Sequence, residues 1–101
     1  MEIRLAGHTQ TCLVDTGCEY TLIPRKLVPD AVIQPAPISI YAANGSRIPI
    51  SGWTEVQFSV QGKNVIAELL VSKDVTEFLL GYYWLKAQHA VWRFDNQTLE
   101  L

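Results

Sequence analysis

The chain has 101 residues, of which 49% are hydrophobic, and a formal net charge of −2 at pH 7. This length predicts a single domain, residues 1–101, with one modest core, and the hydrophobic share excludes a disordered chain. The weak charge and scattered basic residues argue against a nucleic-acid partner, and no apolar run approaches the ~20 residues that span a bilayer.

The cysteine content bears on the compartment. Cys12 and Cys18 are too few for the disulfide framework of a small secreted protein. The first residues also show no basic-then-apolar signal pattern. We therefore expect a reducing, intracellular location and no membrane association.

The predicted elements begin with short strands. A hairpin covers residues 2–15 with its turn near Ala6-Gly7, and a strand over residues 20–24 ends at Pro24. Residues 25–30 form a connector with room for one helical turn. A second hairpin spans residues 38–52 around Asn44-Gly45, a dipeptide that suits the positive φ angles of a tight turn.

The second half continues the same pattern. A hairpin over residues 54–71 has Gly62 in its turn, and an apolar strand over residues 75–81 ends at Gly81. Residues 82–90 have the only helical spacing, and residues 91–101 form a last hairpin. The sequence therefore predicts an all-β domain with one short C-terminal helix.

One carboxylate stands out because of its surroundings. Asp15 directly follows the apolar pair Leu13-Val14, and no Lys or Arg occurs between Arg4 and Arg25. A buried carboxylate without a cation costs several kcal/mol if it stays charged. Asp15 therefore either caps a turn at the surface or performs chemistry, and an isolated Asp-Thr-Gly is more often an Asx-type turn.

The order of four short stretches favours chemistry. The stretch LVDTG, with Asp15, is followed by YTLIP, then by AANGSRIPISG, and finally by FLLG, which ends at Gly81. This combination resembles the retropepsins, the aspartic proteases of retroviruses and LTR retrotransposons, over roughly residues 2–101. The closing GYYWL is most similar to gypsy-type retrotransposon versions.

The resemblance implies a retropepsin-like lobe: a closed β-barrel-like fold with a flap hairpin, working as a homodimer. The chain holds one Asp-Thr-Gly, so the second catalytic aspartate would be the Asp15 of an identical chain on a twofold axis. Two carboxylates sharing one proton supply both the base and the acid that peptide hydrolysis needs. The implied function is an endopeptidase without metal or cofactor that matures its own Gag-Pol-type polyprotein, in the cytoplasm or a virus-like particle.

The resemblance also assigns roles to residues. Asp15, Thr16 and Gly17 are the implied catalytic motif, with Thr16 also bonding across the dimer axis. Hydrophobic walls beside the scissile bond, the flap tip and the strand–helix corner are the implied substrate-binding positions: Leu13, Leu22, Leu79, Ala43, Asn44, Gly45, Ser46 and Gly81. The walls imply a preference for substrates with hydrophobic residues at the cut.

Four further positions follow from the same resemblance. Leu99 and Leu101, in the hairpin over residues 91–101, are the implied dimer contacts. Cys18 stands where the family usually has Ser, Thr or Ala, so a weak donor replaces a better one. Tyr83 stands where relatives often carry a polar residue.

Other interpretations have weaker support. His8, His89 and the two cysteines fit no usual zinc spacing, and Cys18 as a nucleophile or Glu19 as a second acid is less favoured than a packing or surface role. Two functional alternatives stay open: a catalytically weak dimerisation or peptide-binding module of the same fold, and a cellular retropepsin-like protease domain.

Overall fold

The computed structural model describes residues 1–36, 38–41, 44–93, 95 and 98–101, and of Trp92 the backbone alone. The fold is all-β with one short helix, as the sequence predicts. The elements follow one another as β1 Glu2–Leu5, β2 His8–Val14, β3 Leu22–Pro24, a 3-10 turn at Arg25–Leu27, β4 Ile40–Tyr41, β5 Arg47–Ile48, β6 Gly52–Val60, β7 Lys63–Ser72, β8 Phe78–Leu80, α1 Tyr82–Ala87, β9 Val91–Arg93 and β10 Thr98–Glu100.

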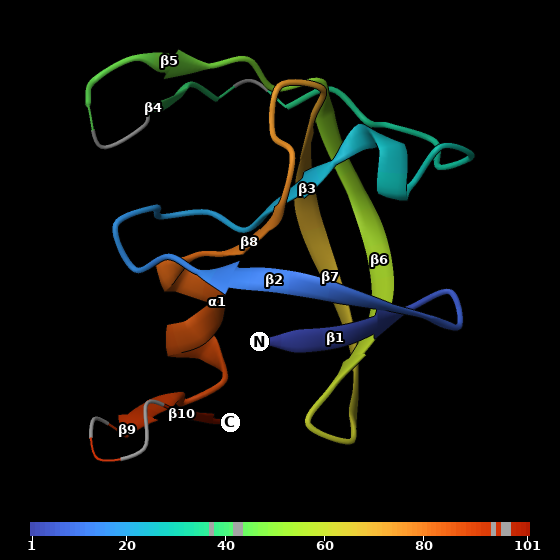
Figure 1. The fold of residues 1–101 in the computed structure, drawn as a ribbon. Helices are drawn as coiled ribbons and strands as arrows, with labels where there is room; N and C mark the ends of the chain where they lie inside the picture. The colour runs from blue at the N-terminus through green and yellow to red at the C-terminus, as the bar shows by residue number, and fades with distance from the viewer. Residues whose placement is uncertain (37, 42–43, 94, 96–97) are drawn as a thin grey trace.

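Six of the strands close into a barrel (Figure 1). Their order around it is β1-β2-β8-β3-β7-β6, so β8 lies between β2 and β3 although it comes much later in the chain. The β2–β8 and β3–β7 pairs are parallel, and the other barrel pairs are antiparallel. This insertion of β8 brings the end of the apolar strand before Gly81 beside the end of the strand before Asp15.

Two barrel hairpins have the turns that the sequence predicts. Ala6 and Gly7 take φ angles of 51° and 79°, and Gln61 and Gly62 take 50° and 76°. Two consecutive residues with positive φ match the twist of antiparallel strands. Strand β6 alternates buried and accessible residues over most of its length, so one face fills the barrel.

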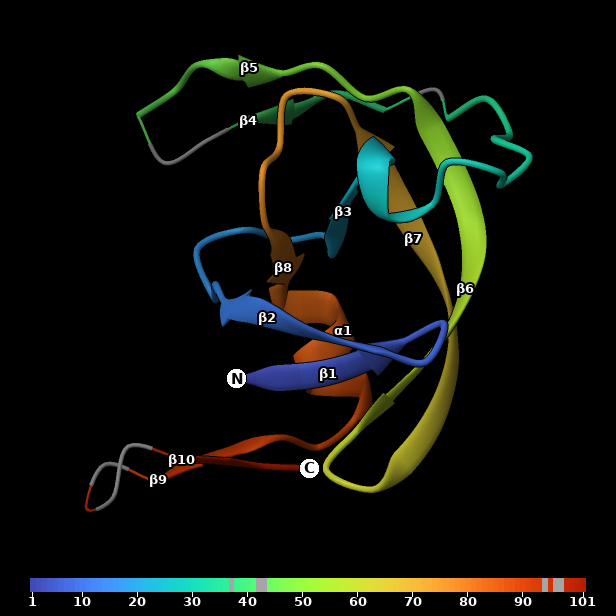
Figure 2. The ribbon, with the colours of Figure 1, turned by 45° about the vertical axis from the view of Figure 1, so that its right-hand side comes forward.

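The apolar side chains form two clusters. The larger fills the barrel, where Phe78 lies edge-to-face against Phe58 with ring centroids 5.4 Å apart, and it extends to Trp84 and Leu85 of α1. The smaller joins Cys18, Leu22, Ile40 and Leu70 beneath the β4–β5 hairpin. Figure 2 shows this hairpin beyond one end of the barrel and the β9–β10 hairpin beyond the other.

The hairpin predicted around Asn44-Gly45 is present. Its described pairs are Ile40 with Ile48 and Tyr41 with Arg47, and residues 42 and 43 lie outside the described residues. The Asn44 side-chain oxygen accepts hydrogen bonds from the Ser46 amide at 3.0 Å and the Ser46 hydroxyl at 2.6 Å. The Asn44 side chain thus forms a local Asx-type turn within the hairpin.

Candidate active site

Asp15 lies immediately after β2, where the parallel β2–β8 pair ends. Its amide donates to the Leu80 carbonyl at 3.0 Å, which extends the ladder by one residue. The Gly17 amide donates to Oδ1 of Asp15 at 3.1 Å, and a Cβ on Gly17 would lie 3.3 Å from that oxygen. The carboxylate is half-buried, and among the described residues it forms no ion pair. Its orientation is therefore set by the backbone, with Oδ2 left for another group.

The loop that follows Asp15 wraps around the start of α1. The amides of Tyr82 and Tyr83 donate to the carbonyls of Cys18 and Glu19 at 2.8 and 3.0 Å. The first amides of a helix have no partner within it, so the loop supplies the missing acceptors. Loop and helix therefore support each other, and a change at the helix start reaches Asp15 through three or four residues of backbone.

Gly81 is the point of closest approach between the two. A Cβ there would lie 2.3 Å from the Tyr20 carbonyl oxygen and 2.9 Å from that of Cys18. The Gly81 amide donates to the buried Thr21 hydroxyl at 3.0 Å. Glycine is thus required by packing at this corner, and the substrate-binding role assigned to Gly81 stays a prediction.

Cys18 is buried in the smaller cluster beneath the flap. Its thiol donates to the Tyr20 carbonyl at 3.2 Å. Burial raises the pKa of this thiol above its ordinary value of 9.0, an effect that its bond to Tyr20 opposes and the nearby charges of Asp15 and Glu19 reinforce. A thiol kept neutral and turned away toward a carbonyl is a packing group and a poor nucleophile.

The predicted hydrophobic walls differ in accessibility. Leu13 is 50% exposed, and its register partner Leu79 is partly exposed. Leu22 pairs with Leu79 across the β3–β8 contact but has no accessible surface. In this conformation Leu13 and Leu79 present surface to a ligand, whereas Leu22 supports them from within the smaller cluster.

The flap hairpin faces the loop that carries Asp15. In Figure 1 the β4–β5 hairpin lies above this loop, and a cavity of about 140 Å³ between them is lined by Gly17, Glu19, Tyr20, Ser39, Ile40 and Tyr41. Asn44, Gly45 and Ser46 lie at the end of the hairpin, with Gly45 at a φ of 86°. Ala43 lies outside the described residues. A cavity of this size has room for about one side chain between a strand edge and a loop.

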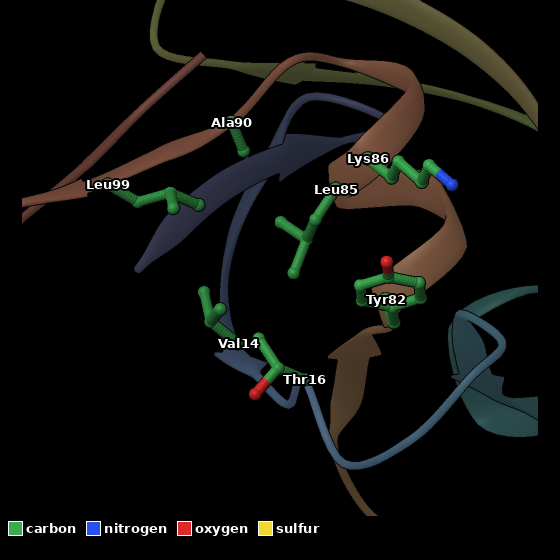
Figure 3. Close-up of a pocket in the computed structure, with 7 residues that line it drawn as sticks. All are labelled: Val14, Thr16, Tyr82, Leu85, Lys86, Ala90 and Leu99. Atoms are coloured by element: carbon green, nitrogen blue, oxygen red, sulfur yellow. The ribbon is translucent and has the colours of Figure 1, made fainter.

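A second hollow lies on the other side of the Asp-Thr-Gly motif. This groove of about 570 Å³ is lined mainly by apolar side chains from the end of β2, from α1 and from β10: Val14, Thr16, Tyr82, Leu85, Lys86, Ala90 and Leu99 (Figure 3). Thr16 is exposed, and its hydroxyl has no hydrogen-bond partner within the described chain. Leu99 is 7% exposed and joins the main core, while Leu101 is half-buried against it.

Sequence reasoning did not identify every residue of this region. Tyr20, Thr21 and Tyr82 support the loop or line its cavities, and Tyr20 lies edge-on to Tyr83 with ring centroids 5.6 Å apart. No local pattern marks such residues, because their roles depend on contacts across about 60 residues of chain.

The described residues contain neither a cluster of metal-binding side chains nor a helix that could span a membrane. No three His, Cys, Asp or Glu side chains gather there as metal ligands do. Within the same part of the chain, no helix is long and apolar enough to cross a membrane.

Comparisons with known proteins place this geometry in a family. Residues 1–87 match the family model described as "gag-polyprotein putative aspartyl protease". A search of curated protein sequences finds no significant match.

Several solved structures share the fold. The retroviral protease-like domain of Ddi1 from Leishmania major is 14% identical, with a TM-score of 0.77 over 99% of this chain and 84% of that one. EIAV protease in complex with the inhibitor HBY-793 is 15% identical, with a TM-score of 0.73 over 93% and 90%. Simian foamy virus (mac) protease is 23% identical, with a TM-score of 0.59 over 88% and 93%.

At these identities the structures establish the fold, a retropepsin-like barrel with a flap hairpin and one short helix. The family match covers most of the chain, including the Asp-Thr-Gly motif and the flap. The chain therefore belongs to the gag-polyprotein aspartyl protease family and has the retropepsin fold.

Proposed function

We propose that two copies of the chain form an aspartic endopeptidase in which the two Asp15 carboxylates share one site. The observation that carries the proposal is the setting of Asp15. Its carboxylate is held by the Gly17 amide, has no cation among the described residues, and stands beside the exposed Thr16 at the end of the β2–β8 pair. A single carboxylate so placed lacks the acid that peptide hydrolysis also needs, and a second copy supplies it.

The reaction follows from the sharing of a proton. Two like charges within hydrogen-bond distance repel each other, so in the active form the two carboxylates share one proton. The ionised carboxylate removes a proton from water as the water oxygen attacks the scissile carbonyl. A proton then passes to the amide nitrogen as the C–N bond breaks, which leaves a carboxylic acid and an amine. The rate has a bell-shaped pH profile whose limbs belong to the pair and not to either residue.

The substrate is an extended polypeptide with hydrophobic residues at the cut. Leu13 and Leu79 provide apolar surface beside Asp15, and the β4–β5 hairpin offers backbone groups that pair with a strand and exclude water. The family description names gag polyproteins, so a Gag-Pol-type polyprotein is the first candidate substrate. Its cleavage would take place in the cytoplasm or in a virus-like particle.

The fold similarity to the Ddi1 domain supports a second candidate. A cellular protease of the same type would use the same Asp15 chemistry on another polypeptide. A catalytically weak binding module is the third, and it differs in a measurable way because it dimerises without cleaving peptides.

The experiment is a mixing assay at pH 5 with a hydrophobic peptide library. Asp15→Asn abolishes cleavage, whereas the matched control Asp30→Asn, at an exposed position outside the site, retains it. Equal amounts of wild-type and Asp15→Asn chains, unfolded and refolded together, retain about one quarter of the activity of the same total amount of wild type, because only dimers with two aspartates cleave. Retention of one half would show that each chain works alone and would refute the shared site.

A further inference from the structure

The end of β10 is attached to the barrel by side chains of a distant turn. Nε2 of Gln61 donates a hydrogen bond to the Leu99 carbonyl, and Oε1 of Gln61 accepts one from the Leu101 amide at 3.3 Å. Nζ of Lys63 donates to the main-chain oxygen of Leu101 at 3.1 Å. Figure 2 shows the end of β10 beside the turn between β6 and β7, which contains Gln61.

The contact has the form of strand pairing. In a strand the backbone groups of alternate residues point to opposite edges, and β10 uses one edge to pair with β9. In a parallel pair, one residue of the neighbouring strand forms two hydrogen bonds. It donates to a carbonyl and accepts from the amide two residues later. The Gln61 carboxamide offers one donor and one acceptor in that arrangement. It therefore caps the second edge of β10 as a one-residue strand.

Side chains of Gln61 and Lys63 make polar contacts between the described part of the β9–β10 hairpin and the barrel. Among the described residues its strands pair with each other and with no barrel strand. Leu99 is its buried anchor, and it also forms a wall of the groove beside Thr16. The apolar contacts of Leu99 and Leu101 with the core and the side chains of Gln61 and Lys63 thus contribute to the position of that wall.

The backbone of Gln61 points to the same role. Its φ of 50° lies in the left-handed region, which Asn and Gly adopt more easily than Gln. Asn carries the same carboxamide on a side chain one carbon shorter, so it would suit the turn better but would not reach β10. The longer side chain is explained by its contact with Leu99 and Leu101.

We propose that Gln61 is a positioning residue for assembly: it holds β10 so that Leu99 shapes the groove beside Thr16 against which the second copy packs. This inference rests on the proposed function, because the groove is an interface only if two chains share the site. Gln61 acts through β10 and touches neither the substrate nor Asp15.

The test compares Gln61→Asn with wild type and with Gln57→Asn, a control at an exposed position on β6. Backbone hydrogen exchange measures the protection of β9 and β10, and sedimentation measures the dimer dissociation constant. Loss of two neutral hydrogen bonds should lower hairpin protection at least about tenfold and raise the dissociation constant by a similar factor. The β6–β7 ladder should keep its protection, since Asn improves the turn.

A second variant separates the hydrogen bonds from packing. In Gln61→Glu the ionised carboxylate still accepts from the Leu101 amide but no longer donates to the Leu99 carbonyl. Below the ordinary carboxyl pKa of about 4.3 the protonated group donates again. Hairpin protection in this variant, relative to wild type at the same pH, should therefore be low at pH 7 and recover at pH 4.

The outcomes decide between the inference and the proposed function. Unchanged hairpin protection in Gln61→Asn, or no recovery of Gln61→Glu at pH 4, overturns the cap. Lower protection with an unchanged dissociation constant overturns its link to assembly. A wild type that is monomeric and inactive refutes the proposed function and with it that link, and the exchange data then decide the cap on their own.

Discussion

Replacing Gly81 with alanine tests the close approach between the helix start and the loop that carries Asp15. The added Cβ would lie 2.3 Å from the Tyr20 carbonyl oxygen and 2.4 Å from its carbon, whereas ordinary contacts begin at 3.4 Å. Both neighbours are backbone atoms, so no side chain can turn away. The loop and the helix must therefore move apart by about 1 Å. A gap of that size removes a large part of the van der Waals attraction between them.

The cost follows from what that separation disrupts. Overpacking in a tight site costs about 1–3 kcal/mol. The bonds from the amides of Tyr82 and Tyr83 to the loop, at 2.8 and 3.0 Å, would lengthen, at about 1 kcal/mol each. We expect a loss of about 3–5 kcal/mol from a total stability of about 5–15 kcal/mol.

The assay is urea unfolding of wild type and Gly81→Ala at the same chain concentration. With an m-value of about 1.2 kcal/mol/M, the urea midpoint should fall by roughly 2.5–4 M. Gly17→Ala is the matched control, because its Cβ would meet only Oδ1 of Asp15 at 3.3 Å and should cost less than about 1 kcal/mol. If Gly81→Ala unfolds within 1 kcal/mol of wild type, the loop and helix are not held as described.

Two further predictions concern the core and the thiols. Phe78→Ala removes a ring with no exposed surface and should lower the free energy of unfolding in urea by about 3–5 kcal/mol. The control Val32→Ala, at a side chain 76% exposed, should change it by less than about 0.5 kcal/mol. Equal effects of the two variants would contradict the assigned core. Burial raises the pKa of both Cys12 and Cys18 above 9.0, so their stabilising effect is fully present below pH 9.0 and is lost as the pH rises through the folded-state pKa. Between pH 8 and pH 10.5 the free energy of unfolding should therefore fall more in wild type than in the Cys12→Ala/Cys18→Ala double variant. Identical decreases would refute buried, neutral thiols.

Much of the fold could be predicted because its signals are local. The turns at Ala6-Gly7 and Gln61-Gly62 join strands that are neighbours in sequence, so turn chemistry and alternation suffice to predict both hairpins. The Asp15 motif and the apolar strand before Gly81 could likewise be identified from short segments. The flap could be predicted as a hairpin, whereas the hydrogen bonds from Ser46 to the Asn44 side chain could not.

What the sequence by itself determined is the set of strands, the one helix and the place of the Asp-Thr-Gly motif after an apolar strand. Only the tertiary structure decided that β8 inserts between β2 and β3, which aligns Val14 with Leu80 and brings the helix start onto the carbonyls that follow Asp15. It also decided that Gln61 meets β10 across about 40 residues of chain. The physical reason is that backbone groups must be paired once buried, and the partner that satisfies them is chosen by the closure of the barrel and not by neighbours in sequence.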